Sequence, residues 1–226
     1  MLKRRVFLGI MMVGATLASA ACDKKGDGGT APATSGSNGA TPAAAGEILV
    51  GAYFSLSGEE TQFGKDSQEG ITLATDELNT AGGVKGRKVK VIYEDTKTNP
   101  QEATNKVRQL IDRNHVVALL GEVASSRSLA GGLIANAAKM PVITPAWTDV
   151  KETGGRGYVF RVCFTDDAQG VAAAEFAIQK LGKKKISILY AAQDPYSSGL
   201  AQSFRDATKK MRGEIVADKG FQKGVK

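Results

Sequence analysis

Apolar and polar positions follow two alternating periods over residues 47–226, and the alternation predicts strands separated by helices. Short apolar or alternating runs at 48–55, 88–95, 116–121 and 141–144 are typical of β-strands, with helical spacing between them. The run at 116–121 is wholly apolar, as in a parallel strand covered on both faces. Four strands joined by helix-length crossovers predict an α/β fold with a doubly wound parallel sheet.

Three helices connect these strands, and each is marked by apolar residues at helical spacing. Gly82-Gly83 ends the first helix and Pro141 closes the third. The marking residues are Ile71, Ala74, Leu78 and Ala81, then Ala103, Val107, Leu110 and Ile111, and finally Leu129, Leu133, Ile134 and Ala137.

A second round of the pattern follows the segment 158–166. It predicts a helix over 167–181, a strand over 185–190, a helix carrying Leu200, Phe204, Ala207 and Met211, and a strand over 213–220. Two strands and two helices cannot complete a sheet covered on both faces, so we expect the second lobe to be incomplete and the sequence to be a fragment. The expected division is 47–163 for the first lobe and 164–226 for the first part of the second.

The first 46 residues carry targeting signals. Lys3, Arg4 and Arg5 precede an apolar stretch ending in small residues, which predicts an export signal over 1–21. Cys22 follows "SAA" directly, and this resembles a bacterial lipoprotein signal whose cysteine is acylated; ordinary cleavage after Ala20 is the alternative. "KRRVFLG" also resembles a twin-arginine signal, so the export route stays open. The rest of 22–46 has no large apolar residue and is expected to be a disordered tether.

The net charge changes little once the export signal is set aside. Removing the signal lowers it from +7 to +4, and no basic stripe interleaved with aromatic residues remains. The composition, with 42% hydrophobic and 23% charged residues, is that of an ordinary globular protein. We therefore expect no nucleic-acid partner.

The loops beyond the carboxyl ends of the strands are where such sheets bind ligands, namely 56–64, 96–100, 121–126 and 145–149. The first loop fails as a P-loop because five residues separate its two glycines and Asp66 replaces the Ser or Thr that binds Mg²⁺. His115 is the single histidine, and its position before the third strand puts it at the opposite end of the sheet. A Ser-His-Asp relay or a metal cluster is therefore not expected, nor is any cofactor.

Ser125 and Ser126 stand where the buried strand gives way to a helix. They could cap the helix, supply a nucleophile or hold an anion at the helix N-terminus. The residues alone do not choose between a cap and an anion site.

Several motifs in order resemble the periplasmic leucine/isoleucine/valine-binding proteins, the receptors of amino-acid ABC importers. The motifs are "LSG…FG", "ELNTAGGVKGRK", "DTKTNP" and "GEVAS", with "TPAWTD" and "FRVCFTDDAQG" following. The resemblance implies two α/β lobes on a hinge near 163–166 that close over a free amino acid.

Carried over residue by residue, the resemblance implies a set of ligand contacts. Ser125 and Thr148 would bind the α-carboxylate, Ser126 would help through its amide, and the carbonyl of Ala146 would accept the α-ammonium. Phe63 and Tyr196 would be the aromatic residues against the ligand, and the acid that pairs the ammonium would lie beyond this sequence. Trp147 stands where the family carries a smaller residue, so it is expected to alter the side-chain pocket.

The expected function is that of an extracytoplasmic solute-binding lipoprotein and not an enzyme. It would capture a small amino acid, namely a branched-chain amino acid or a related amide, and deliver it to an ABC permease. The protein would act in the periplasm or cell envelope, where a lipid on Cys22 would hold it to the membrane. The alternatives are a sensory ectodomain with the same clamp and, less favoured, a serine-dependent hydrolase.

Overall fold

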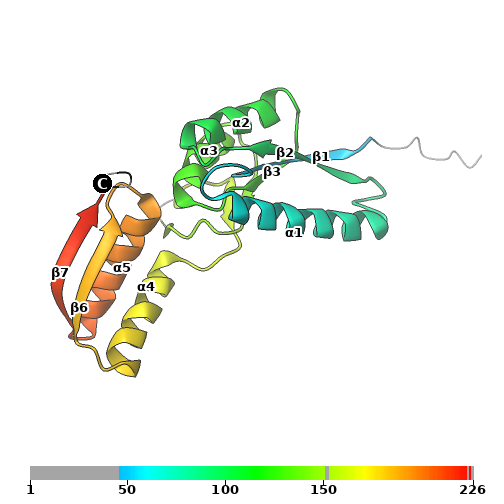
Figure 1. Cartoon of the computed structure of the whole chain (residues 1–226). Coiled ribbons are helices and arrows are strands. Elements are labelled where there is room, and N and C mark those ends of the chain that lie inside the picture. Colours follow the sequence, from blue (N-terminus) through cyan, green and yellow to red (C-terminus); the bar gives the residue numbers. More distant parts are fainter. Residues whose placement is uncertain (1–45, 151–152, 223, 225–226) are drawn as a thin grey trace, which may run out of the picture. The chain divides into compact units, whose positions relative to one another are not determined.

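The computed structural model describes residues 46–150, 153–222 and 224 (Figure 1). The strands are β1 Ile48–Phe54, β2 Val89–Asp95, β3 Ala118–Gly121, β4 Val142–Thr144, β5 Val159–Arg161, β6 Lys185–Ala191 and β7 Glu214–Phe221. The helices are α1 Thr61–Thr80, α2 Pro100–Asp112, α3 Ser125–Ala137, α4 Asp166–Glu175 and α5 Pro195–Lys210, with α4 continued by the π-helical turn η2 Phe176–Lys180. The predicted export signal, most of the tether and Cys22 lie outside the described residues.

The first sheet has five strands in the order β2-β1-β3-β4-β5, and every pairing is parallel. This confirms the predicted parallel sheet. It also adds a fifth strand, because Val159 of β5 pairs with Val142 of β4. Helices α2 and α3 cover one face of the sheet and α1 lies on the other (Figure 1).

The core of the first sheet lies mainly under α2 and α3. Three of the four predicted apolar positions of α2 are fully buried there and Ile111 is partly buried; residues of β1, β3 and β4 are buried with them. The members are Tyr53, Ala103, Val107, Leu110, Val116, Leu119, Ala135, Val142, Trp147 and Val159.

Helix α3 forms where the sequence predicts it, but its most buried positions include small residues, whereas of its two leucines Leu129 is only partly buried against the core and Leu133 faces outward. Leu133 is 47% exposed, whereas Gly131 and Gly132 are buried. A Cβ atom on Gly131 would lie 2.6 Å from Cε2 of Tyr53, and one on Gly132 would lie 2.9 Å from Cζ3 of Trp147. The helix approaches these two aromatic side chains so closely that only glycine fits.

The second sheet is the parallel pair β6-β7. Helix α5 packs on both strands and α4 packs on α5, with Gly170 so close that an added Cβ would lie 2.6 Å from Cβ of Ser203. The helix predicted over 167–181 is confirmed within one residue at each end, although its last turn is π-helical. No helix in the described ranges is both long and apolar enough to span a bilayer.

Candidate functional site

A cavity of about 670 Å³ is lined by residues from the carboxyl ends of strands in both sheets. All six residues predicted to contact a ligand line it. They are Phe63, Ser125, Ser126, Ala146, Thr148 and Tyr196. Residues separated by up to 133 positions in the sequence therefore meet at one cavity because parallel strands place their carboxyl ends at the same edge of a sheet.

Ser125 is the first residue of α3 and not its cap. The cap position is Ala124, whose extended backbone is followed directly by the helix, and no side chain caps it. The capping interpretation of Ser125 is therefore wrong. Its side chain is buried, and its hydroxyl makes no hydrogen bond to another described residue. The hydroxyl and the first amides of α3 together can hold an anion.

The loop after β4 positions Ala146 and Thr148. Thr144 organises this loop, since its hydroxyl donates to the Glu122 carbonyl oxygen at 2.6 Å and accepts from the Trp147 amide at 3.1 Å. The Thr148 hydroxyl is buried and has no hydrogen-bond partner within the described part of the chain. A buried hydroxyl without a partner is costly, so this oxygen is suited to a polar ligand atom.

Aromatic side chains form much of the remaining wall. Phe63 lies in the first turn of α1 and is exposed. Tyr196 lies in the first turn of α5, where Gln169 Nε2 donates to its hydroxyl at 3.4 Å. Phe164 and Phe221 also line the cavity. The sequence interpretation missed both; Phe164 had a signal in its place within the quoted segment "FRVCFTD", and Phe221 had none.

A buried ionic cluster around Glu122 and Arg127 lies beside the cavity, and the sequence analysis did not predict it. Oε1 of Glu122 accepts from the hydroxyls of Ser55 at 2.5 Å and Thr96 at 2.9 Å, and from Arg127 Nε at 2.9 Å. Arg127 also pairs with Glu60. Burial opposes the charged form of Arg127, but the Glu122 charge and hydrogen bonds to both glutamates raise its pKa. Arg127 and Glu60 both line the cavity, so this ion pair forms part of its wall.

Asp95 fixes the loop that precedes α1. Its Oδ1 accepts from the amides of Leu56 at 2.9 Å and Ser57 at 3.1 Å, and from the Lys97 amide at 2.8 Å. Partial burial raises the pKa of this carboxyl, but hydrogen bonds from Ser57 and the three amides outweigh it, and the pKa is lowered. Asp95 therefore remains an anion that joins the ends of β1 and β2.

Two sequence expectations concern residues away from the cavity. Trp147 was expected to alter the ligand's side-chain pocket, but it is 1% exposed in the core of the first sheet and does not line the cavity. That expectation is wrong because Gly132 opens room for the indole beneath α3. His115 lies just before β3, away from the cavity lining, and no cluster of three or more His, Cys, Asp or Glu suited to a metal ion occurs among the described residues.

Comparisons with known proteins agree on one family. Residues 47–225 match the family described as "Periplasmic binding protein". An amino acid binding protein of Pseudomonas aeruginosa is 30% identical over 182 residues, which are 80% of this chain and 48% of that protein. A Leu/Ile/Val-binding protein of Citrobacter freundii is 31% identical over 182 residues, or 80% of this chain and 49% of that protein.

Solved structures give the same result. A leucine-binding protein, LivK, of Thermotoga maritima superposes with a TM-score of 0.74 at 34% identity, over 79% of this chain and 50% of that one. The branched-chain amino acid binding protein LivJ of Streptococcus pneumoniae, solved with isoleucine, also gives 0.74 at 34% identity, over 79% and 51% of the two chains. The chain thus spans about half the length of the relatives it matches.

Proposed function

Given that the chain belongs to the periplasmic binding protein family, whose members are binding proteins and not enzymes, we propose that it takes part in capturing a small amino acid for an ABC importer. The favoured ligand is a branched-chain amino acid or a related amide. The observation that carries the proposal is the shared cavity of Ser125 and Thr148.

The chemistry of the cavity suits a zwitterion. Its carboxylate would accept hydrogen bonds from the Ser125 and Thr148 hydroxyls and the Ser126 amide, while its ammonium would donate to the Ala146 carbonyl oxygen. Hydrogen bonds to charged groups contribute about 1.5–3 kcal/mol each. Phe63 and Tyr196 would contact the aliphatic side chain, since both present apolar rings to the cavity.

The place of action follows from the first residues of the sequence. An export signal over 1–21 and an acylated Cys22 would hold the protein at the outer side of a membrane, on a tether over 22–46. A coil of that length spans on the order of 25–30 Å, enough for the folded part to reach a permease. Two lobes, 47–163 and 164–226, would close over the ligand about 163–166.

Calorimetric titration tests the proposal directly. The protein is titrated with leucine, isoleucine, valine, their amides and, as a contrast, glutamate. Saturable heat with a branched-chain ligand is expected. No heat with any member of the panel would overturn the proposal.

A separate experiment tests the lipid on Cys22. The parent and the Cys22→Ala variant are labelled with palmitate and compared by mass spectrometry, and only the parent should carry the label.

A further inference from the structure

Asp166 is a buried carboxylate whose oxygens have no hydrogen-bond partner among the described residues. It is the first residue of α4, is 2% exposed, and its amide donates to the Thr148 carbonyl oxygen at 2.9 Å. Neither carboxylate oxygen lies within hydrogen-bond distance of a donor in the described residues. A buried anion of this kind requires a counter-charge or a donor to offset its lost hydration.

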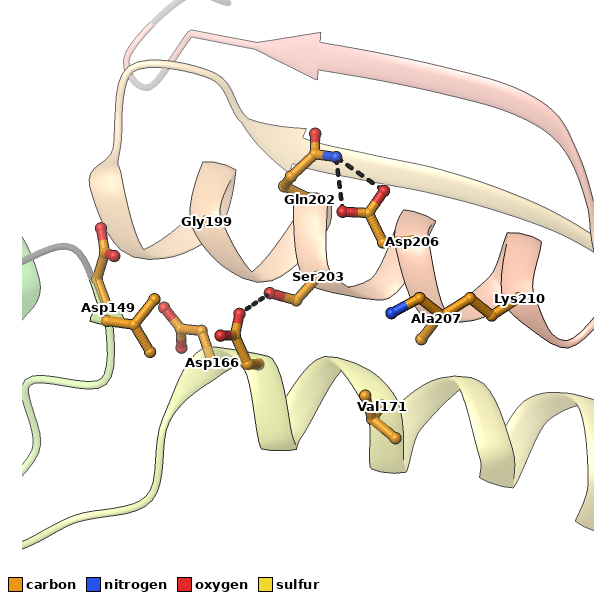
Figure 2. A pocket seen from close by; sticks show the side chains of 11 residues that line it. Asp149, Asp166, Val171, Gly199, Gln202, Ser203, Asp206, Ala207 and Lys210 are labelled. Carbon is orange, nitrogen blue, oxygen red and sulfur yellow. Dashed lines mark hydrogen bonds between the residues drawn. The ribbon is translucent and has the colours of Figure 1, made fainter.

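Asp166 lines a second cavity, of about 340 Å³, between Asp149 and Val150 of the β4–β5 loop and helices α4 and α5 (Figure 2). Three further carboxylates line it, those of Asp149, Asp167 and Asp206, against one cation, Lys210. The cavity is separate from the one that holds Ser125, since the two share no lining residue.

Two of the neighbouring carboxylates accept hydrogen bonds from side chains of α5. Asp167 Oδ1 accepts from the Ser203 hydroxyl at 2.7 Å, and the two oxygens of Asp206 accept from Gln202 Nε2 at 3.0 and 3.1 Å (Figure 2). These donors are uncharged. Burial is the largest cause that raises the pKa of Asp166; the charges of Asp149 and Asp167 act in the same direction, and the Thr148 side chain and the Arg161 charge oppose them only in part. With four aspartates and one lysine in its lining, the cavity is suited to a cation.

The arrangement favours a nitrogen cation over a metal ion. No group of three or more carboxylates in the described residues is close enough for a metal ion. Gly199 of α5 lies beside Asp166 and Asp149. Asp206 follows Gly199 by seven positions of the same helix, which is about 10 Å along its axis. Val150, Val171 and Ala207 supply apolar surface in the same cavity. Two anionic ends joined by an apolar wall match a flexible chain with an ammonium group at each end.

We propose that this cavity binds a linear aliphatic diamine or polyamine, with one ammonium group at Asp166 and Asp149 and another at Asp206. The proposal is independent of the amino-acid function. Gly199 leaves the first end open, because a Cβ there would lie 3.5 Å from Oδ2 of Asp166 and 3.7 Å from Oδ2 of Asp149.

Thermal unfolding of the whole chain with spermidine or putrescine, in the absence of any amino acid, tests the proposal. Sodium chloride at matched ionic strength and calcium chloride serve as comparisons. We expect spermidine to raise the melting temperature more than either salt. An equal rise with sodium chloride, or a larger one with calcium, would overturn the proposal.

Three variants separate binding from folding. Asp166→Asn removes the unpaired charge while keeping its shape, so the unliganded melting temperature should rise while the spermidine affinity falls at least tenfold. Gly199→Ala should raise helix stability and still weaken binding, because its methyl group lies against both carboxylates. Lys210→Gln should tighten spermidine binding, because it removes the cation that lines the cavity.

Glu175→Gln is the matched control, because Glu175 is an exposed residue of α4 outside the cavity. This variant should bind spermidine as the parent does. Parental affinity in Asp166→Asn would refute the site.

Discussion

Arg127 Nε donates to Oε1 of Glu122 across 2.9 Å, and the two side chains are 4% and 0% exposed. The same carboxylate accepts from Ser55 and Thr96, and the same guanidinium pairs with Glu60. One buried ion pair therefore joins the ends of β1, β2 and β3 with the start of α1. These segments position Phe63 and Ser125, so the pair holds the first-sheet side of the cavity in shape.

Removal of Arg127 should be strongly destabilising. Arg127→Ala leaves Glu122 buried with hydroxyl partners only, and breaking a buried pair in this way typically costs about 3–5 kcal/mol of the free energy of unfolding. Chemical denaturation followed by circular dichroism measures the change. Lys90→Ala is the control, because Lys90 pairs with Glu47 at 3.5 Å on the surface and such pairs contribute about 0–1 kcal/mol. Equal midpoints for the two variants would contradict the structural role of Arg127.

The face of α3 gives a second prediction. Gly131→Ala places a Cβ atom 2.6 Å from Tyr53, and overpacking of this kind costs about 1–3 kcal/mol of unfolding free energy. Gly70→Ala, in the exposed part of α1, meets no atom within 4 Å and should instead stabilise the protein by about 0.5–1 kcal/mol. Thermal melting of both variants provides the comparison. An unchanged melting temperature in Gly131→Ala would mean that α3 does not lie this close to β1.

The two glycines also show where sequence reasoning succeeds and where it stops. Periodicity locates α3, because a helix of this length repeats its apolar residues visibly. Periodicity does not identify the buried face of α3. Gly131 and Gly132 are buried because their small size allows close packing, whereas Leu133 is exposed although its side chain is apolar. Which face of α3 is buried depends on how closely it packs on Tyr53 of β1 and Trp147 of the β4–β5 loop. These residues are not part of the α3 sequence, so the local pattern does not reveal the contact.

The candidate site divides in the same way. The family resemblance implies Ser125 and Thr148 as ligand contacts, and the fold brings them to one cavity. The ionic cluster was missed because Arg127 and Glu60 are 67 residues apart and neither belongs to a motif. The charged Glu122 at the end of an otherwise apolar strand was the available signal, since a charge in such a place requires a partner.

Ser125 should matter for ligand binding and little for folding. Because its hydroxyl makes no hydrogen bond to a described residue, Ser125→Ala should leave the melting temperature within about 2 °C while weakening amino-acid binding by about 1.5–3 kcal/mol, or roughly 10- to 150-fold. Thermal unfolding measures the melting temperature, and isothermal titration calorimetry measures the affinity for the amino acid. Ser187→Ala, on the exposed side of β6, is the control and should bind like the parent. Unchanged affinity in Ser125→Ala would place the ligand elsewhere.

Asp95 should make the protein less stable in acid. Its folded-state pKa lies below its usual value, so its contribution is present at neutral pH and is lost as the pH falls through the folded pKa. Asp95→Asn removes most of that contribution, which we expect to be about 1–2 kcal/mol because the group is partly exposed. Urea unfolding between pH 2 and pH 7 should show the parent and the variant converging at low pH. A constant difference across the range would exclude ionisation of Asp95 as the cause.

Asp166 should have the opposite dependence on pH. Burial raises its folded-state pKa above the usual value near 3.8, so the folded protein binds this proton more tightly than the unfolded chain does. Stability then falls as the pH rises from about 4 through the folded pKa, because the Thr148 side chain and the Arg161 charge offset only part of the cost of ionising the buried group. Asp166→Asn carries no such penalty, and its free energy of unfolding should exceed the parent's by an amount that grows over this interval and then levels off. Glu175→Gln, which alters an exposed carboxylate of the same helix, should show no growing gap. Urea unfolding of all three proteins at closely spaced pH values makes the measurement, and a gap that narrows with rising pH would mean that Asp166 has a stabilising partner when ionised.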